Sequence, residues 1–269
     1  MNRRDMAKTF ILAGVAVAVA GTVAEAQALP TGASHLTEIL KQGTLRVGTT
    51  GDFNPMSFRN PGSNEYQGFD IEAMVELAKE LGVKIEWVST EWATLVAGIA
   101  ANRFDIFSGA SVSMGRARTA AFSAPYIEAG TVPLSLKANA GKFKTWEAIN
   151  DPGVKVAVSM GTVFHDQAKQ HFPKAAIQAV QSPATGYQEV LAGRADVTIT
   201  SNVEASTLVK RFDQLVVDVQ GSEMRNKRPF AYVVAQDDVN WLNYVNTWIA
   251  LKRSEGFFDK LEKKWLPSS

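Results

Sequence analysis

The chain of 269 residues contains no cysteine and only three histidines. Without cysteine it forms no disulfide and offers no thiol for a lipid anchor. The histidines, His35, His165 and His171, lack the spacing of a metal site, because positions 165 and 171 would lie on different faces of a helix. The sequence also contains no Gly-x-Ser-x-Gly elbow and no phosphate-binding glycine loop. We therefore expect neither a metal nor a cofactor.

Net charge is also nearly absent. Removing residues 1–28 takes away three of the 28 basic and two of the 27 acidic side chains, which leaves 25 of each. Proteins that bind nucleic acid need a basic surface to displace counterions from phosphates. We expect no nucleic-acid partner, and we expect a monomer.

The first 28 residues have the pattern of a secretory signal. Arg3, Arg4 and Lys8 form a basic head, an uncharged apolar run covers residues 9–24, and Ala-x-Ala sequences end at residues 26 and 28. The apolar run is short for a membrane span. The pattern predicts cleavage and a bacterial periplasmic location, and the arginine pair is compatible with twin-arginine export.

The rest of the chain alternates helix and strand patterns. Residues 70–81 repeat apolar side chains at helical spacing, with Asp70 placed to cap the start and Gly82 to end the helix. Extended apolar segments occur at 130–137 and 228–235, and a self-contained series of strands and helices lies between them. Such alternation predicts an α/β fold with a parallel sheet.

Two segments repeat one pattern. Residues 95–108 and 187–200 each read as helix, small residue, Arg-x-Asp, strand and hydroxyl residue. The repeat predicts two similar lobes, with the second lobe (133–229) inserted into the first (29–132 and 230–269) through two crossing strands. Strand ends of the two lobes would face a cleft that closes on a small molecule by hinge motion.

The stretch 103–126 contains the densest set of candidate ligand contacts. It predicts a buried strand over 104–107 that ends in Ser108, Gly109 and Ser111, where ligands bind in open α/β sheets. Arg116 follows with a planar guanidinium that can hold a carboxylate through two parallel hydrogen bonds. A polar turn with a solvated arginine is the alternative.

Several motifs resemble the family of extracytoplasmic solute-binding proteins that feed amino acids to ABC importers. The similar segments are Leu-Arg-Val-Gly-Thr at 45–49, Gly-Phe-Asp-Ile-Glu at 68–72, Arg-Phe-Asp-Ile at 103–106, Phe-Ser-Ala-Pro-Tyr at 122–126 and Gly-Arg-Ala-Asp-Val at 193–197. The resemblance covers nearly the whole chain after the signal. It implies a two-lobed periplasmic binding protein fold of type II, a small carboxylate ligand and an ABC permease in the inner membrane as partner.

The resemblance also implies roles for individual residues. Arg116 matches the family's carboxylate-binding arginine, and Ser111 and Thr162 match positions that complete the carboxylate site. Phe53 and Trp92 match the aromatic pair that sandwiches the ligand.

One position departs from the family pattern. Ser201 stands where the family usually places an aspartate that neutralises the ligand's ammonium group, and a serine does not balance a buried cation. Either Glu204 takes that role, or the ligand is not an ordinary α-amino acid. Ser201 and Glu204 are therefore further candidate ligand contacts.

Within the family, the chain is similar to cyclohexadienyl dehydratases, which suggests an enzyme as the alternative function. Glu204 matches their general acid, which would protonate a leaving hydroxyl while carbon dioxide departs from prephenate or arogenate. However, residues 159–164 lack the Gly-Gly-Thr-Asn run expected there. Ser201 and Glu204 also have the spacing of a helix capping box, so capping, ligand contact and catalysis all stay open for Glu204.

Overall fold

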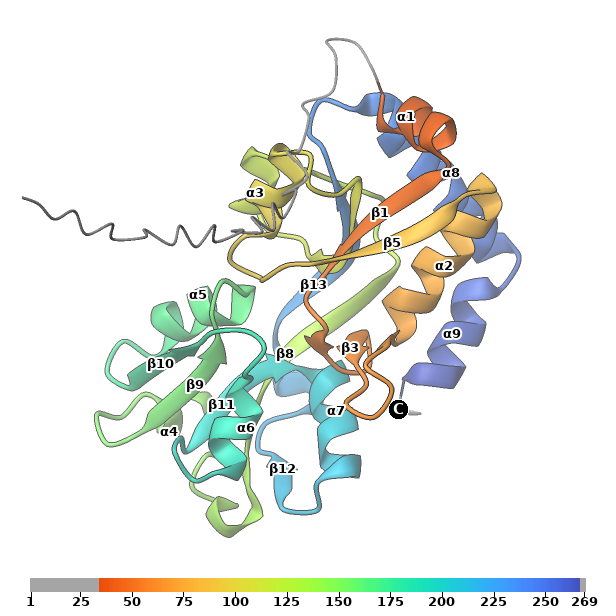
Figure 1. The fold of residues 1–269 in the computed structure, drawn as a ribbon. Helices are drawn as coiled ribbons and strands as arrows, with labels where there is room; N and C mark the ends of the chain where they lie inside the picture. The colour runs from red at the N-terminus through yellow and green to blue at the C-terminus, as the bar shows by residue number, and fades with distance from the viewer. Residues whose placement is uncertain (1–33, 267–269) are drawn as a thin grey trace, which may run out of the picture.

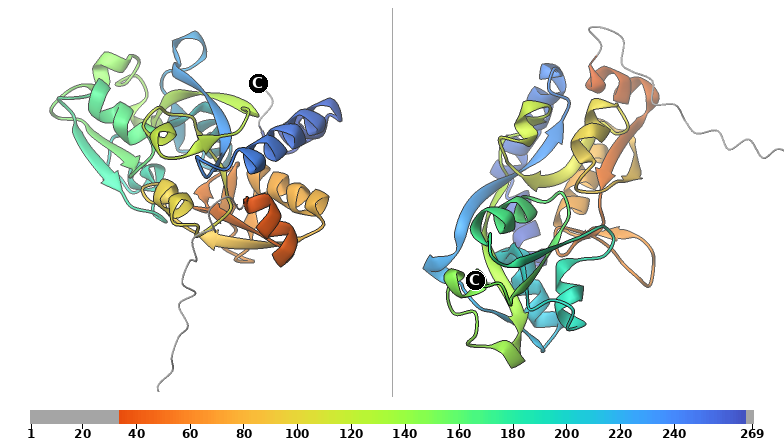
Figure 2. Two further views of the ribbon diagram at one scale, coloured as in Figure 1. Left: turned by 90° about the horizontal axis from the view of Figure 1, so that it is seen from above. Right: turned by 90° about the vertical axis from the view of Figure 1, so that its left-hand side faces the viewer.

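The computed structural model describes residues 34–266, and the segment 1–28 that we expect to be a signal lies outside them. Figure 1 shows two bodies: the red-to-yellow first part and the blue last part of the chain form one, and the green-to-cyan middle part forms the other. Figure 2 shows the same division from two further sides.

The elements of the first body flank those of the second in the sequence. The first run comprises α1 (His35–Gln42), β1 (Thr44–Thr49), β2 (Asp52–Phe53), β3 (Ser57–Arg59), β4 (Tyr66–Gln67), α2 (Phe69–Leu81), β5 (Lys84–Ser89), α3 (Leu95–Ala100), β6 (Ile106–Ser111), η1 (Arg116–Arg118), β7 (Ala121–Phe122) and β8 (Ile127–Leu136). The inserted run comprises η2 (Lys137–Asn139), α4 (Trp146–Ile149), β9 (Lys155–Ser159), α5 (Val163–His171), β10 (Ala176–Val180), α6 (Gly186–Leu191), β11 (Val197–Ser201), α7 (Asn202–Arg211), β12 (Leu215–Val217) and η3 (Gly221–Glu223). The chain then returns through β13 (Arg225–Val234), α8 (Val239–Ser254) and α9 (Phe257–Trp265).

The strand order has the same arrangement in both bodies. Along the main sheet it is β10-β9-β11-β8-β13-β6-β1-β5. β1 pairs in parallel with β5 and β6, and β9 pairs in parallel with β10 and β11. The sequence repeat thus corresponds to α3–β6 in one body and α6–β11 in the other.

The long strands β8 and β13 connect the two bodies. They pair with each other in antiparallel fashion, while β8 also pairs with β11 and β13 also pairs with β6. The predicted fold, two α/β lobes with the second inserted through two crossing strands, is confirmed. We propose the lobe ranges given above, 29–132, 133–229 and 230–269. The junction after residue 132 falls within β8, and the junction after residue 229 falls within β13.

The helix α2 begins differently from the prediction. Gly68 is its N-cap at φ 130°, and a side chain there would collide with the backbone of Met56. Asp70, expected as the cap, instead lies buried in the first turn, where burial raises its pKa well above the usual value. The helix ends at Gly82 as predicted, in a left-handed conformation.

Strand β6 continues further than the sequence predicted. It runs to Ser111, so Ser108 and Gly109 lie inside the sheet, not in a loop beyond it. Ser108 is fully buried, and a side chain at Gly109 (φ 146°) would collide with the Tyr126 hydroxyl and the Asp70 carboxyl. Only the end of β6 is left to face a ligand.

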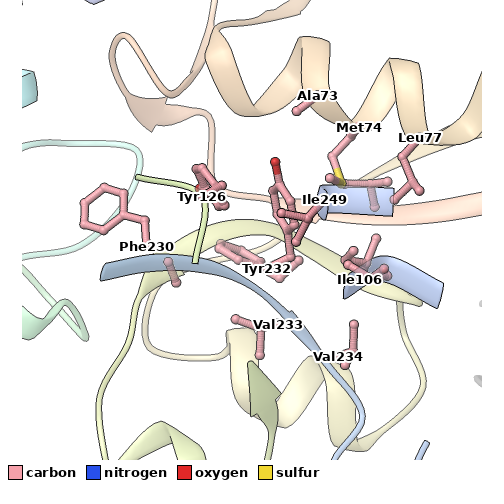
Figure 3. Close-up of a cluster of buried hydrophobic side chains, with 14 of the residues drawn as sticks. Ala73, Met74, Leu77, Ile106, Tyr126, Phe230, Tyr232, Val233, Val234 and Ile249 are labelled. Carbon is pink, nitrogen blue, oxygen red and sulfur yellow. The ribbon is translucent and has the colours of Figure 1, made fainter. Parts of the chain in front are cut away.

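Each lobe has its own hydrophobic core. Figure 3 shows part of the first-lobe core, in which side chains of α2, β6, β13 and α8 meet around Tyr126 and Tyr232. Phe230, on β13, points away from the other labelled side chains. The second lobe has two smaller clusters, around Val156 and around Leu134. Within residues 34–266, no helix combines the length and apolar character needed to cross a membrane.

Candidate ligand-binding site

A cavity lies between the lobes, with about 580 Å³ of empty space that includes space open to solvent. The first lobe contributes, among others, Asp52, Phe53, Trp92, Ser111, Arg116 and Phe230, and the second contributes Thr162, Val163, Phe164, Tyr187, Thr200 and Glu204. Six of the nine residues that the sequence pointed to therefore meet here. The other three, Ser108, Gly109 and Ser201, do not line this cavity.

Arg116 links the lobes at one side of the cavity. Its guanidinium donates to the carbonyl of Ser111 (3.2 Å) in its own lobe and to that of Gly161 (3.1 Å) in the other. It also lies 5.9 Å from the centre of the Trp92 ring. Burial lowers its pKa to about 10, against the opposing charge of Asp166, so it stays cationic at neutral pH.

The hydrogen-bond acceptors of the guanidinium are both neutral carbonyls. Among the ion pairs of residues 34–266, none involves Arg116. Beside it, α5 begins at Val163, and the first N–H groups of a helix have no intrahelical acceptor. Val163 and Phe164 both line the cavity. A positive charge and helix N–H donors together form a suitable place for a carboxylate.

Thr162 is the N-cap of α5. Its hydroxyl accepts from the amide of His165 (3.3 Å) and donates to the carbonyl of Ser159 (2.7 Å). The hydroxyl therefore positions the helix start in this structure, in addition to lining the cavity.

Aromatic rings form one wall of the cavity. Phe53 and Trp92 contact each other edge to face, with their centres 5.9 Å apart, and Phe230 packs at the same distance from Phe53. In this structure, the two rings expected to sandwich a ligand thus lie against each other and form a continuous apolar surface.

Glu204 projects into the cavity from the first turn of α7. It is 8% exposed, and its carboxyl accepts a hydrogen bond from the hydroxyl of Thr200. Burial raises its pKa to about 8, and the nearby charge of Asp52 raises it too, against the lowering effect of the Thr200 bond. At neutral pH this carboxyl is therefore mostly protonated and can donate a proton or a hydrogen bond.

Only half of the expected capping box is present. The Ser201 hydroxyl accepts from the amide of Glu204 (3.1 Å) and so caps α7. The Glu204 carboxyl does not reach back to the backbone of Ser201 but bonds Thr200 instead. The Ser201 hydroxyl is thus used to cap α7, and Ser201 does not line the cavity. The side chain of Glu204 takes no part in the cap and faces the cavity.

Asp52 is one of the lining residues that the sequence reasoning missed. One of its oxygens accepts from Trp92 Nε1 (2.8 Å) and Thr50 Oγ1 (2.6 Å), and the other accepts from the hydroxyl of Ser182 in the opposite lobe. Its place directly before Phe53, in the loop after β1, was the available signal. The partners that define its role are distant in sequence.

Tyr187 adds a phenol to the lining of the cavity. Burial raises its pKa, as do the charges of Glu204 and Asp52, so the hydroxyl keeps its proton. Among residues 34–266, no group of three or more histidine and acidic side chains could hold a metal ion.

Comparison with known proteins agrees with the fold. Residues 45–268 match the model of the bacterial extracellular solute-binding proteins, family 3. A cyclohexadienyl dehydratase of Pseudomonas aeruginosa is 34% identical, over 87% of this chain and 86% of that protein. The L-cystine-binding protein TcyJ of Escherichia coli is 29% identical, over 86% and 85%.

A solved structure is similar over the same range. The ancestral amino acid-binding protein AncCDT-1, described as a precursor of cyclohexadienyl dehydratase, superimposes with a TM-score of 0.81 at 39% identity, and the match covers 87% of this chain and all of that one. The chain therefore belongs to the bacterial extracellular solute-binding proteins, family 3.

Proposed function

We propose that this protein binds a small carboxylate-bearing solute, an amino acid or a similar compound, between its lobes and delivers it to an ABC permease of the inner membrane. The observation that carries the proposal is Arg116, a cation without a carboxylate partner that bonds both lobes across the cavity. A ligand carboxylate at this position would gain charge-assisted hydrogen bonds and draw the lobes together. Relatives that are named for binding cystine or lysine, arginine and ornithine support the class of ligand.

The proposed roles of the lining residues follow from their chemistry. Arg116 and the start of α5 hold the carboxylate, together with Ser111 at the end of β6. Phe53 and Trp92 supply the apolar wall against which the rest of the ligand packs. We place the protein in the periplasm, exported by the signal at residues 1–28, which fits an extracellular family of binding proteins.

Replacing Arg116 by alanine tests this function. Loss of a buried charge-assisted pair should weaken ligand binding by at least about 100-fold, measured by titration calorimetry. Arg118→Ala is the matched control, because Arg118 is an exposed arginine on the same short helix η1. Equal affinities of the Arg116→Ala variant and the wild type would contradict the proposal.

A second candidate is the dehydratase activity, and the buried, protonated carboxyl of Glu204 that lines the cavity favours it. With prephenate, the bond to the departing carboxylate would break, its electrons would move into the ring, and the ring hydroxyl would leave as water with the proton of Glu204. The relative of 34% identity is named for this enzyme. The altered loop 159–164 argues for binding without turnover.

Incubation with prephenate separates the two functions. Formation of phenylpyruvate, followed by absorbance, that disappears in Glu204→Gln would establish the enzyme. We expect binding without product, in the wild type and in the variant alike.

A further inference from the structure

An α-amino acid brings an ammonium group into the cavity together with its carboxylate. Removing a cation from water is costly unless an anion or several acceptors replace its hydration. The lining side chains therefore indicate which group the site accepts on the ligand carbon next to the carboxylate. The acidic side chains that line the cavity are Asp52 and Glu204, and Ser201 stands where the family usually places an aspartate.

Ser201 offers no negative charge, and its hydroxyl is used by α7. It accepts the amide of Glu204 and does not line the cavity. An ammonium group thus finds no anion at the end of β11, the strand that Ser201 closes.

Asp52 has a carboxylate, but donors within the chain already surround it. Both oxygens are engaged, by Trp92 and Thr50 on one side and by Ser182 of the other lobe on the second. Moving Asp52 toward a ligand ammonium would break the contact between the lobes and release the indole of Trp92. Its charge therefore serves the structure of the closed site.

Glu204 is the acid that remains, and its surroundings favour the neutral form. The carboxyl is buried, its one hydrogen-bond partner is the hydroxyl of Thr200, and no ion pair of residues 34–266 involves it. The charged groups that share the cavity with it are Asp52 on β2 and Arg116 on η1, and the phenol of Tyr187 on α6 also lines the cavity. A neutral carboxyl and a phenol are hydrogen-bond donors, which suit an oxygen atom better than an ammonium group.

We infer that the cavity prefers carboxylates with an uncharged oxygen beside the carboxylate, that is α-keto or α-hydroxy acids, over the corresponding α-amino acids. The inference rests on the proposed function, because Arg116 must hold the carboxylate. It narrows the ligand to acids whose carboxylate would meet Arg116, which is the one basic side chain among the residues lining the cavity in the described part of the chain.

Matched ligands test this inference. For each of three side chains (benzyl, isobutyl and methyl), the α-amino, α-keto and α-hydroxy acid are titrated into the wild-type protein by calorimetry at pH 7. We expect the keto or hydroxy acid of the best-bound series to bind at least about tenfold more tightly than the amino acid. The reason is that the amino acid would bury an ammonium group that has no anionic partner. Equal or tighter binding of the amino acid would overturn the inference and leave the proposed function intact. If none of the nine compounds binds, the inference and this form of the proposed function both fail.

Glu204→Gln provides the second test. Glutamine has the same shape, stays neutral and keeps a hydrogen-bond donor, so the ratio of the affinity for the keto or hydroxy acid to that for the matched amino acid should stay within about threefold of the wild-type ratio. If Glu204 instead served as the anion for an ammonium group, the variant would lose amino-acid affinity by about tenfold or more, and the inference would be wrong. Arg116→Ala should lose all ligands of the series, which separates failure of the carboxylate site from failure of the selectivity.

Discussion

Two acidic side chains of the cavity, Asp52 and Glu204, differ in their burial and in their hydrogen-bond donors. Asp52 accepts from an indole and two hydroxyls, which compensate a carboxylate. Glu204 has a single hydroxyl donor and is buried, so its pKa is raised to about 8. The two side chains carry the same carboxyl group but have different roles. That of Asp52 connects the lobes, and that of Glu204 faces the ligand as a neutral acid.

Glu204 makes stability depend on pH. Its pKa rises from 4.5 to about 8 on folding, so between these values the folded protein holds a proton that the unfolded chain releases. Stability should then fall as pH rises through this range, by an amount on the order of a few kcal/mol. Glu204→Gln removes this slope.

Urea denaturation at pH 5 and pH 8 measures the effect. The difference in the free energy of unfolding between Glu204→Gln and the wild type should shift in favour of the variant at the higher pH. A difference that is independent of pH would show that Glu204 is already ionised in the folded protein.

At the scale of single elements, β6 and α7 explain which site residues sequence could identify. Hydroxyl residues after Phe107 suggested that the strand had ended, but small side chains such as Ser108 also fit inside a sheet, and β6 continues to Ser111. In α7, the Ser201–Glu204 spacing predicted a cap correctly for the serine only.

The helical and alternating patterns, together with the repeat, were sufficient to predict two lobes and their crossing strands. Asp52 was not predictable in the same way, because its role depends on Trp92 and Ser182, which lie 40 and 130 positions further along the chain. The spacing of residues in the sequence predicts which helix or strand a residue belongs to. Contacts between the lobes depend on the assembled fold and are not predicted by that spacing.

The loop after β10 is one of the elements through which the second lobe contacts the first. Ser182 donates to Asp52, and Gln181 Nε2 lies 3.3 Å from the carboxylate oxygens of Glu91. Ser182→Ala should remove a bond that exists only when the lobes meet, and weaken ligand binding about three- to tenfold. Ser254→Ala, at the exposed end of α8, is the control. Calorimetric affinity of Ser182→Ala equal to that of the control would show that this loop does not contribute to closure.

At the scale of the whole molecule, the lobes share one sheet through β8 and β13 and meet again across the cavity. Gly161, between β9 and α5, lies close to the first lobe: a Cβ built on it would lie 2.4 Å from the Cα of Ala93. Such an overlap with backbone prevents the lobes from reaching this arrangement. Gly193 is the matched control, because its φ of 68° is similar to the 77° of Gly161 but no atom lies near its Cβ position.

Closure of the two lobes on a carboxylate is the central claim, and small-angle X-ray scattering tests it directly. The radius of gyration of the wild type and of Gly193→Ala should fall when the tightest-binding acid of the matched series is added at saturation. That of Gly161→Ala should stay at the unliganded value, because the added methyl group keeps the lobes apart. A wild type that does not contract, or a Gly161→Ala variant that contracts equally, would contradict the account.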